Sequence, residues 1–154
     1  MKAFTKYLAE EQDMLIFGTE MAKVINYQAI VIYLYGQLGS GKTTFTRGFL
    51  RGLGFLQKVK SPTYTLVETY EFDKIKVFHL DLYRVNCVDE LKYIGLDDCF
   101  LPAVICLIEW PEKGGALLPP ADLACYFSFE RAGRAVDLKA YSSLGNNILK
   151  QVKS

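Results

Sequence analysis

Residues 36–43 fit the pattern G-x-x-x-x-G-K-[ST], which binds the phosphate groups of nucleotides. They are Gly36, Gln37, Leu38, Gly39, Ser40, Gly41, Lys42 and Thr43. Glycines let the backbone approach phosphate oxygens, and consecutive amide N–H groups form a concave anion site with the start of the following helix. We expect the Lys42 ammonium to reach the β- and γ-phosphates and the Thr43 hydroxyl to bind Mg²⁺, with Thr44 at the nucleotide. The sequence therefore predicts a nucleoside triphosphate site.

The segments on either side of this loop have the character that the site requires. Residues 29–35 form a short apolar, β-branched and aromatic run, which is typical of a buried strand. After the loop, apolar residues recur at helical spacing until two glycines loosen the helix: Phe45, Phe49, Leu50 and Leu53, with Gly52 and Gly54. Strand, loop and helix therefore follow in the required order.

Two acidic residues each follow an apolar strand pattern. Residues 104–108 lead to Glu109, and residues 77–80 lead to Asp81. In open α/β sheets, ligands bind at the carboxyl ends of the strands, so both carboxylates are candidates for the metal site. One would hold Mg²⁺ while the other orients the attacking water. The sequence does not assign the two roles, although we favour Glu109 as the closer ligand, and an ion pair with Arg84 or a lysine is the structural alternative.

Two aromatic side chains near these acids have two interpretations each. His79 is the one histidine, and on an apolar strand it is more often a hydrogen-bonded core residue than a catalyst. Trp110, beside Glu109, would either shield the phosphate site or dock a partner, or else simply pack in the core.

Two further segments have functional and structural interpretations. Ser61, Thr63 and Thr65 precede a strand pattern, and they would either sense a γ-phosphate as a switch or satisfy a turn. Arg131 and Arg134 flank a short turn, where they would either contact phosphate or remain solvated.

The remaining pattern predicts an α/β fold. Strands are expected over residues 4–8, 64–72, 75–82, 123–129 and 136–141, with helices over residues 14–25 (capped by Asp13), over 88–94, and after Ser142 or Ser143. Strands that alternate late in the chain favour antiparallel members. We therefore expect a single domain over residues 1–154, with a P-loop NTPase-like three-layer fold and a mixed central sheet covered by helices on both faces.

Composition argues against several classes of protein. The chain has 18 Lys and Arg against 17 Asp and Glu, so its overall charge gives no reason to expect an autonomous nucleic-acid or membrane binder. Its apolar runs are far shorter than the ~20 residues that span a bilayer. The first eleven residues lack the apolar core of a secretory signal, so we expect a cytoplasmic protein.

Four blocks together resemble the TsaE (YjeE) family of ATPases, which act in tRNA threonylcarbamoyladenosine biosynthesis. The blocks are residues 36–48, residues 61–68 (Ser-Pro-Thr-Tyr-Thr-Leu-Val-Glu), residues 79–84 (His-Leu-Asp-Leu-Tyr-Arg) and residues 108–111 (Ile-Glu-Trp-Pro). Many nucleotide-binding proteins share the first block, whereas the other three are close to diagnostic at these separations. The resemblance runs from about residue 8 to residue 141.

The resemblance implies ATP as the nucleotide, with Thr43 and Glu109 around Mg²⁺ and Asp81 near the metal and the attacking water. It also implies a switch-like role for residues 61–65 and places Trp110 at the functional face. Residues 10–13, with Glu11 among them, would lie near the adenine. The implied partners are the TsaD and TsaB proteins, with TsaC in the same pathway, and tRNA would be held mainly by these partners.

Two other functions are compatible with a phosphate-binding loop. A small-molecule kinase would use Arg131 and Arg134 as a lid and Asp81 as the base for an acceptor hydroxyl. A GTPase is disfavoured because no [NT]-K-x-D segment that reads guanine follows the loop.

Overall fold

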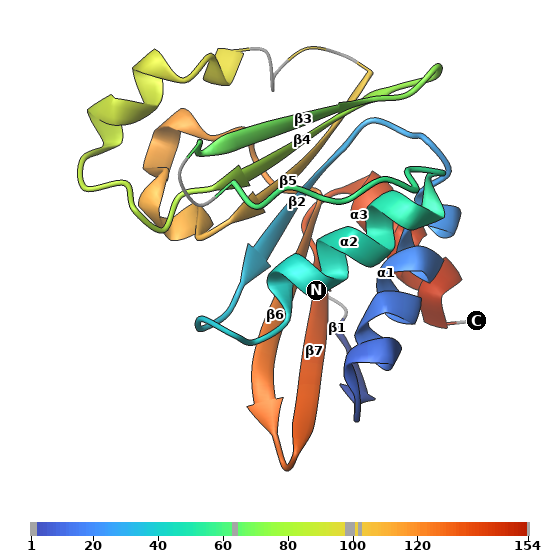
Figure 1. The fold of residues 1–154 in the computed structure, drawn as a ribbon. Coiled ribbons are helices and arrows are strands. Elements are labelled where there is room, and N and C mark those ends of the chain that lie inside the picture. The colour runs from blue at the N-terminus through green and yellow to red at the C-terminus, as the bar shows by residue number, and fades with distance from the viewer. Residues whose placement is uncertain (1–2, 63–64, 98–100, 102, 154) are drawn as a thin grey trace.

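The computed structural model describes residues 3–62, 65–97, 101 and 103–153. Its centre is a seven-stranded sheet with the order β1-β7-β6-β2-β5-β4-β3 (Figure 1). The strands are β1 (Ala3–Leu8), β2 (Ile30–Tyr35), β3 (Val67–Glu71), β4 (Lys76–Asp81), β5 (Val104–Glu109), β6 (Leu123–Glu130) and β7 (Gly133–Ala140). The helices are α1 (Glu11–Ile25), α2 (Lys42–Gly52) and α3 (Ser143–Lys153), with short 3-10 helices η1 (Val88–Tyr93), η3 (Pro111–Lys113) and η4 (Gly115–Leu117).

The sheet is mixed, as the sequence predicts. Strand β2 pairs in parallel with β5 and β6, and β4 pairs in parallel with β5. The outer pairs β1–β7, β6–β7 and β3–β4 are antiparallel. The parallel strands therefore end at one common edge, where β2 leads into the phosphate-binding loop and β4 and β5 deliver their acidic residues.

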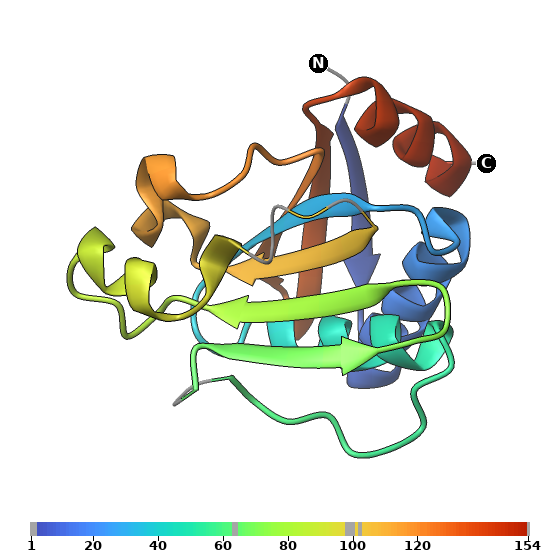
Figure 2. The ribbon, with the colours of Figure 1, turned by 90° about the horizontal axis from the view of Figure 1, so that it is seen from above.

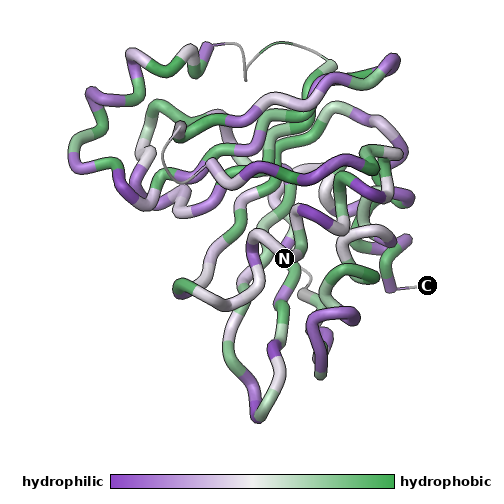
Figure 3. Tube along the Cα trace, in the orientation of Figure 1, coloured by the Kyte–Doolittle hydropathy of each residue, from purple (hydrophilic) through white to green (hydrophobic). Residues whose placement is uncertain are grey.

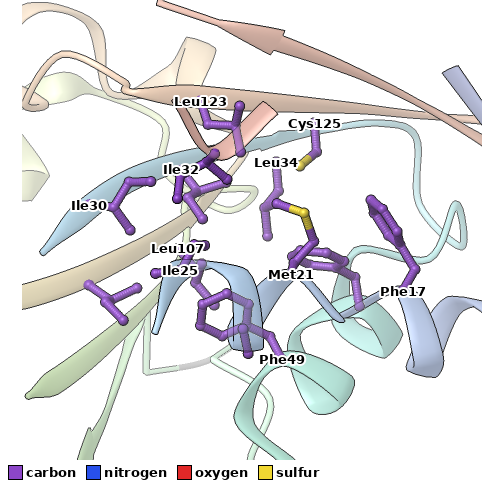
Figure 4. Close-up of a cluster of buried hydrophobic side chains, with 14 of the residues drawn as sticks. Phe17, Met21, Ile25, Ile30, Ile32, Leu34, Phe49, Leu107, Leu123 and Cys125 are labelled. Atoms are coloured by element: carbon purple, nitrogen blue, oxygen red, sulfur yellow. The ribbon is translucent and has the colours of Figure 1, made fainter. Parts of the chain in front are cut away.

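The three α-helices pack on one face of the sheet. Their apolar side chains meet those of the strands in the larger core cluster, for example Phe17 and Met21 of α1 against Ile32 and Leu34 of β2 (Figure 4). Buried apolar residues of this kind supply most of the driving force for folding. Hydrophobic residues follow the central strands, whereas the tip of the β6–β7 hairpin is hydrophilic (Figure 3).

The other face of the parallel strands is covered by the 3-10 helices and their connecting segments, which lie apart from the α-helices (Figure 2). A second core cluster forms there, in which Leu91 of η1 and Leu118 after η4 pack with Leu80 of β4 and Ile108 of β5. The expected three layers are therefore present, with α-helices on one face and short 3-10 helices on the other. Strands β4 and β5 are consequently buried from both sides.

Helix α2 is held in place by an unusually close crossing with α1. A Cβ atom added at Gly48 would lie 2.2 Å from the Leu15 carbonyl oxygen, so no larger residue fits without moving a helix. The hydroxyl of Thr19 also donates to the Gly48 carbonyl at 3.0 Å. This crossing fixes the helix whose first turn closes the phosphate-binding loop.

Several element boundaries differ from the sequence prediction, whereas the start of α3 agrees with it. Helix α1 begins at Glu11, because Asp13 is not its N-cap but accepts the Glu10 amide in a capping box. The strand predicted over residues 64–72 is shorter, Val67–Glu71, and Tyr64 lies outside the described residues. Helix α3 starts as expected, since Ser142 Oγ accepts the Gly145 amide at 3.0 Å.

Candidate nucleotide site

The loop at residues 36–43 connects β2 to α2 as a tight backbone cradle. Gly36, Gly39 and Gly41 have φ angles of 152°, 78° and 112°. A Cβ atom at Gly36 would lie 2.8 Å from the Phe127 carbonyl oxygen, so the chain path requires glycine there. The first turn of α2 has neither an acidic residue nor a side-chain cap, which leaves its N-terminal N–H groups available to an anion.

Lys42 is the charged centre of this cradle. Its side chain is buried, and Nζ donates to the carbonyl oxygens of Gly36 and, at 3.0 Å, of Gln37. The same ammonium lies 4.7 Å from the centre of the Trp110 ring. Burial lowers the pKa of Lys42, and the nearby acids Glu109 and Asp81 oppose that effect. The ammonium therefore lies where a phosphate oxygen could replace its loop carbonyls.

Both predicted acids line the same pocket as the loop. A cavity of about 210 Å³, called the phosphate pocket below, is lined by Leu38, Gly39, Gly41, Lys42, Thr43, Thr44, Asp81, Glu109 and Trp110. Asp81 and Glu109 are directly opposite each other in the parallel β4–β5 pair. Burial is the main cause that raises the pKa of Asp81, and the Glu109 charge adds to it, whereas the Tyr83 amide, which donates to Asp81 Oδ1 at 3.0 Å, opposes it.

The donor set fits a divalent cation that also binds phosphate. Among the described residues, no group of three or more His, Cys, Asp or Glu side chains could hold a metal alone. Mg²⁺ is usually bound by one or two carboxylates together with waters and substrate phosphates. Thr43, Asp81 and Glu109 line the pocket beside the phosphate cradle, so the site suits such an ion in company with a nucleotide.

His79 and Glu109 form a buried pair beneath this pocket. The His79 Nε2 and Glu109 Oε2 atoms lie 2.7 Å apart, and the two side chains are 0% and 5% exposed. The interpretation of His79 as a hydrogen-bonded core residue is therefore confirmed, but its partner is one of the two candidate metal acids.

A second cavity, of about 380 Å³, lies on the other side of the loop. It is lined by Leu8, Ala9, Glu10, Glu11, Gly39, Gly41, Thr44, Ala132, Gly133 and Arg134. The two cavities share Gly39, Gly41 and Thr44. The phosphate pocket thus shares part of its lining with a space between the start of α1 and the β6–β7 turn. That space is also lined by Glu11, which the family resemblance places near the adenine.

Trp110 lies at the boundary between the core and the phosphate pocket. It packs against the second core cluster and also lines the phosphate pocket, and its ring lies 5.0 Å from that of Tyr83. Its φ of 56° is in the left-handed region, which is uncommon for a bulky side chain. The chain turns sharply there, directly after Glu109.

The two turn arginines and the segment at residues 61–65 differ in whether they contact the loop or the pocket. Arg134 donates to the Gly39 carbonyl at 3.1 Å and so contacts the loop, whereas the Arg131 guanidinium lies over the Tyr7 ring. The Thr65 hydroxyl donates to Glu68 at 3.1 Å, and neither Ser61 nor Thr65 lines the phosphate pocket. Thr63 lies outside the described residues.

Sequence reasoning missed Arg47, on the second turn of α2. Its guanidinium donates to Glu11 at 3.2 Å and to the Thr44 hydroxyl at 3.3 Å. It therefore links the start of α1 to the loop helix. The only signal available was its spacing, three residues after Thr44 on the same helical face.

The mixed sheet, the glycine cradle leading into α2 and the acids at the strand ends define the chain as having a P-loop NTPase-like fold. The crystal structure of YdiB from Bacillus subtilis has the same fold, with a TM-score of 0.83 and 25% sequence identity, over 99% of this chain and 95% of that one.

Sequence comparisons narrow the class to one family. The family model described as "Threonylcarbamoyl adenosine biosynthesis protein TsaE" matches residues 8–136. The tRNA threonylcarbamoyladenosine biosynthesis protein TsaE of Haemophilus influenzae is 44% identical over 97% of both chains, and that of Bacillus subtilis is 38% identical over 75% of this chain and 71% of its own. The chain belongs to the TsaE family.

Within the described residues, no helix combines the length and the apolar character needed to cross a membrane.

Proposed function

We propose that this protein is a Mg²⁺-dependent ATPase that supports threonylcarbamoylation of adenosine 37 in tRNA by acting on a complex of TsaB and TsaD. The observation that carries the proposal is the shared pocket in which Lys42 and Thr43 of the loop meet Asp81 and Glu109 of two neighbouring strands. The relatives named for this pathway supply the biological context.

The two cavities suggest how ATP would lie. The triphosphate would occupy the smaller one, where loop amides and the Lys42 ammonium neutralise its charge. The adenosine part would lie in the larger one, beside Glu11 and Arg134. Thr44 lines both, so its hydroxyl would lie between the two parts of the nucleotide.

The chain's own residues would divide the chemistry between them. Lys42 would stabilise charge on the transferred phosphoryl group, since phosphoryl transfer depends chiefly on positioning and electrostatics. Thr43 and Glu109 would hold Mg²⁺, which supplies further charge neutralisation when bound. Asp81 would orient the attacking water, and its raised pKa favours that role because a higher pKa makes a carboxylate a better proton acceptor.

The kinase alternative has less support. Its lid required both Arg131 and Arg134, but Arg131 lies over the Tyr7 ring and Arg134 is already bound to the Gly39 carbonyl of the loop. A switch needs no acceptor pocket, because its output is a change in its partner.

Phosphate release should be measured with and without TsaB and TsaD, using Lys42→Ala as the inactive control. We expect the partners to accelerate hydrolysis. Rates that the partners leave unchanged would argue strongly against a partner-directed switch. Labelled phosphate that appears on a metabolite, rather than as free phosphate, would support the kinase instead.

A further inference from the structure

The His79–Glu109 pair is the least expected contact in the site. His79 is completely buried, and its Nε2 lies 2.7 Å from Glu109 Oε2. A buried charge-assisted hydrogen bond of this length is strong and directional. Glu109 is also buried, yet it lines the phosphate pocket, so its carboxylate has one oxygen tied to the interior of the protein.

The parallel pairing of β4 with β5 makes this contact possible. His79 is opposite Leu107, and two residues further along Asp81 is opposite Glu109. Because side chains alternate along a strand, His79 lies on the same face as Asp81, one step deeper in the sheet. The imidazole therefore reaches diagonally from β4 to the last residue of β5.

The hydrogen bond with Glu109 also determines which imidazole nitrogen of His79 carries a proton. An ionised carboxylate only accepts hydrogen bonds, so His79 Nε2 must carry the proton that it donates to Glu109. His79 Nδ1 is buried and has no partner among the described residues. The contact with Glu109 thus requires a proton on Nε2 of the ring.

We propose that His79 is a positioning residue, whose Nε2–H holds Oε2 of Glu109 and thereby keeps the other carboxylate oxygen directed to the pocket beside Lys42 and Thr43. A free glutamate side chain samples several rotamers about each of its torsions. The imidazole restricts Glu109 to one of them before any nucleotide binds. The catalytic consequence of this role rests on the proposed ATPase function, whereas the contact itself does not.

The contact can be tested without turnover, because the chain has a single histidine. In protein labelled with ¹⁵N-histidine, NMR should show one imidazole whose Nε2 carries a proton. In Glu109→Ala both nitrogen signals should move toward values for a mixture of tautomers. Signals that are identical in the wild-type protein and Glu109→Ala would overturn the proposal.

The positioning role is tested by three substitutions that differ in reach. His79→Gln places an amide donor near the position of Nε2, whereas His79→Asn is too short to reach Glu109 and His79→Leu has no donor. Loss of a residue that orients a metal ligand typically costs about 10- to 100-fold in activity or metal affinity. We expect that loss in the Mg²⁺ dependence of nucleotide binding and in kcat for the Asn and Leu variants, with substantial recovery in the Gln variant.

Thermal melting separates this role from simple packing. If His79 only fills space, the Mg²⁺ dependence and kcat will follow melting temperature across the three variants, and His79→Gln will show no recovery; that result would refute the positioning role. If wild-type protein hydrolyses no ATP even with its partners, the proposed function fails, while NMR and Mg²⁺ binding still decide the role of His79.

Discussion

The two walls of the phosphate pocket are built in different ways. The loop wall comes from residues 36–43, which are contiguous in the chain and act mainly through backbone groups. The acidic wall comes from Asp81 and Glu109, which are brought face to face by the parallel register of β4 and β5. A cradle of backbone groups can bind any phosphate, whereas carboxylates on neighbouring strands can specify what happens to it. Nucleotide binding should therefore depend mainly on the loop wall, whereas turnover should need both walls.

The largest difference between turnover and binding should come from Glu109→Ala on the acidic wall. We expect turnover to fall about 10²- to 10³-fold, as for loss of a group that stabilises transition-state charge, while nucleotide affinity measured without Mg²⁺ changes much less. Stimulated phosphate release and fluorescent-nucleotide binding would measure the two quantities. Glu112→Ala is the matched control, because this exposed acid lies three residues further on and does not line the pocket. Equal losses in binding and turnover would contradict the separation of the walls.

Lys42→Ala on the loop wall should weaken nucleotide binding as well as abolish turnover. Removing a charged hydrogen bond costs about 1.5–3 kcal/mol, which corresponds to a loss of about 10- to 150-fold in nucleotide affinity. Titration calorimetry would measure it, with Lys23→Ala as the control, since Lys23 is an exposed residue in the last turn of α1. Unaltered affinity would refute the assignment of the loop.

The two walls also differ in how far the sequence revealed them. The loop was predictable because all of its determinants lie within eight residues and their spacing alone defines the cradle. The candidates Asp81 and Glu109 were found from strand ends, but their adjacency depends on strand order, which local patterns do not encode. The pairing of His79 with Glu109 was not predictable, because the two residues are 30 positions apart and meet only through the β4–β5 register.

The same reasoning accounts for the fold. Long periodic elements such as β2, α2 and β5 were predicted within one or two residues, since burial enforces their patterns. The start of α1 was harder to predict, because its N-cap is Glu10, a residue type that seldom caps helices, whereas Asp13, a common N-cap type, occupies N3 of the capping box. The second cavity could not be foreseen in detail, as it joins the start of α1, the loop and the β6–β7 turn.

The Asp81 carboxylate of the acidic wall should lower the stability of the folded protein near neutral pH, and Asp81→Asn tests this. Burial, reinforced by Glu109, raises the pKa of Asp81, so in the folded protein its ionised form is disfavoured. For an acid whose pKa is raised on folding, the stabilising effect is present at low pH and is lost as pH rises from the unfolded value, about 3.9, through the folded pKa. Asparagine avoids this loss and still accepts the Tyr83 amide.

We therefore expect Asp81→Asn to melt at a higher temperature than wild type at pH 7, with the difference shrinking toward pH 4. A stability change of 1 kcal/mol corresponds to about 2–4 °C in a chain of this size. Differential scanning calorimetry across this range would measure the difference. A variant that is less stable than wild type at neutral pH would contradict the assigned cause of the pKa shift.

The smallest effect should come from Trp110, where the two walls touch. Its ring lies 4.7 Å from the Lys42 ammonium, a cation–π contact that a phosphate group would have to replace along with the loop carbonyls. Such contacts are worth about 0.5–1 kcal/mol at partly exposed sites, so Trp110→Leu should tighten nucleotide binding about two- to fivefold. Trp110→Phe keeps an aromatic face and should lie between the two. If Trp110→Leu weakens binding instead, the ring belongs to the nucleotide site itself, and the acidic wall would then contribute to affinity as well as to turnover.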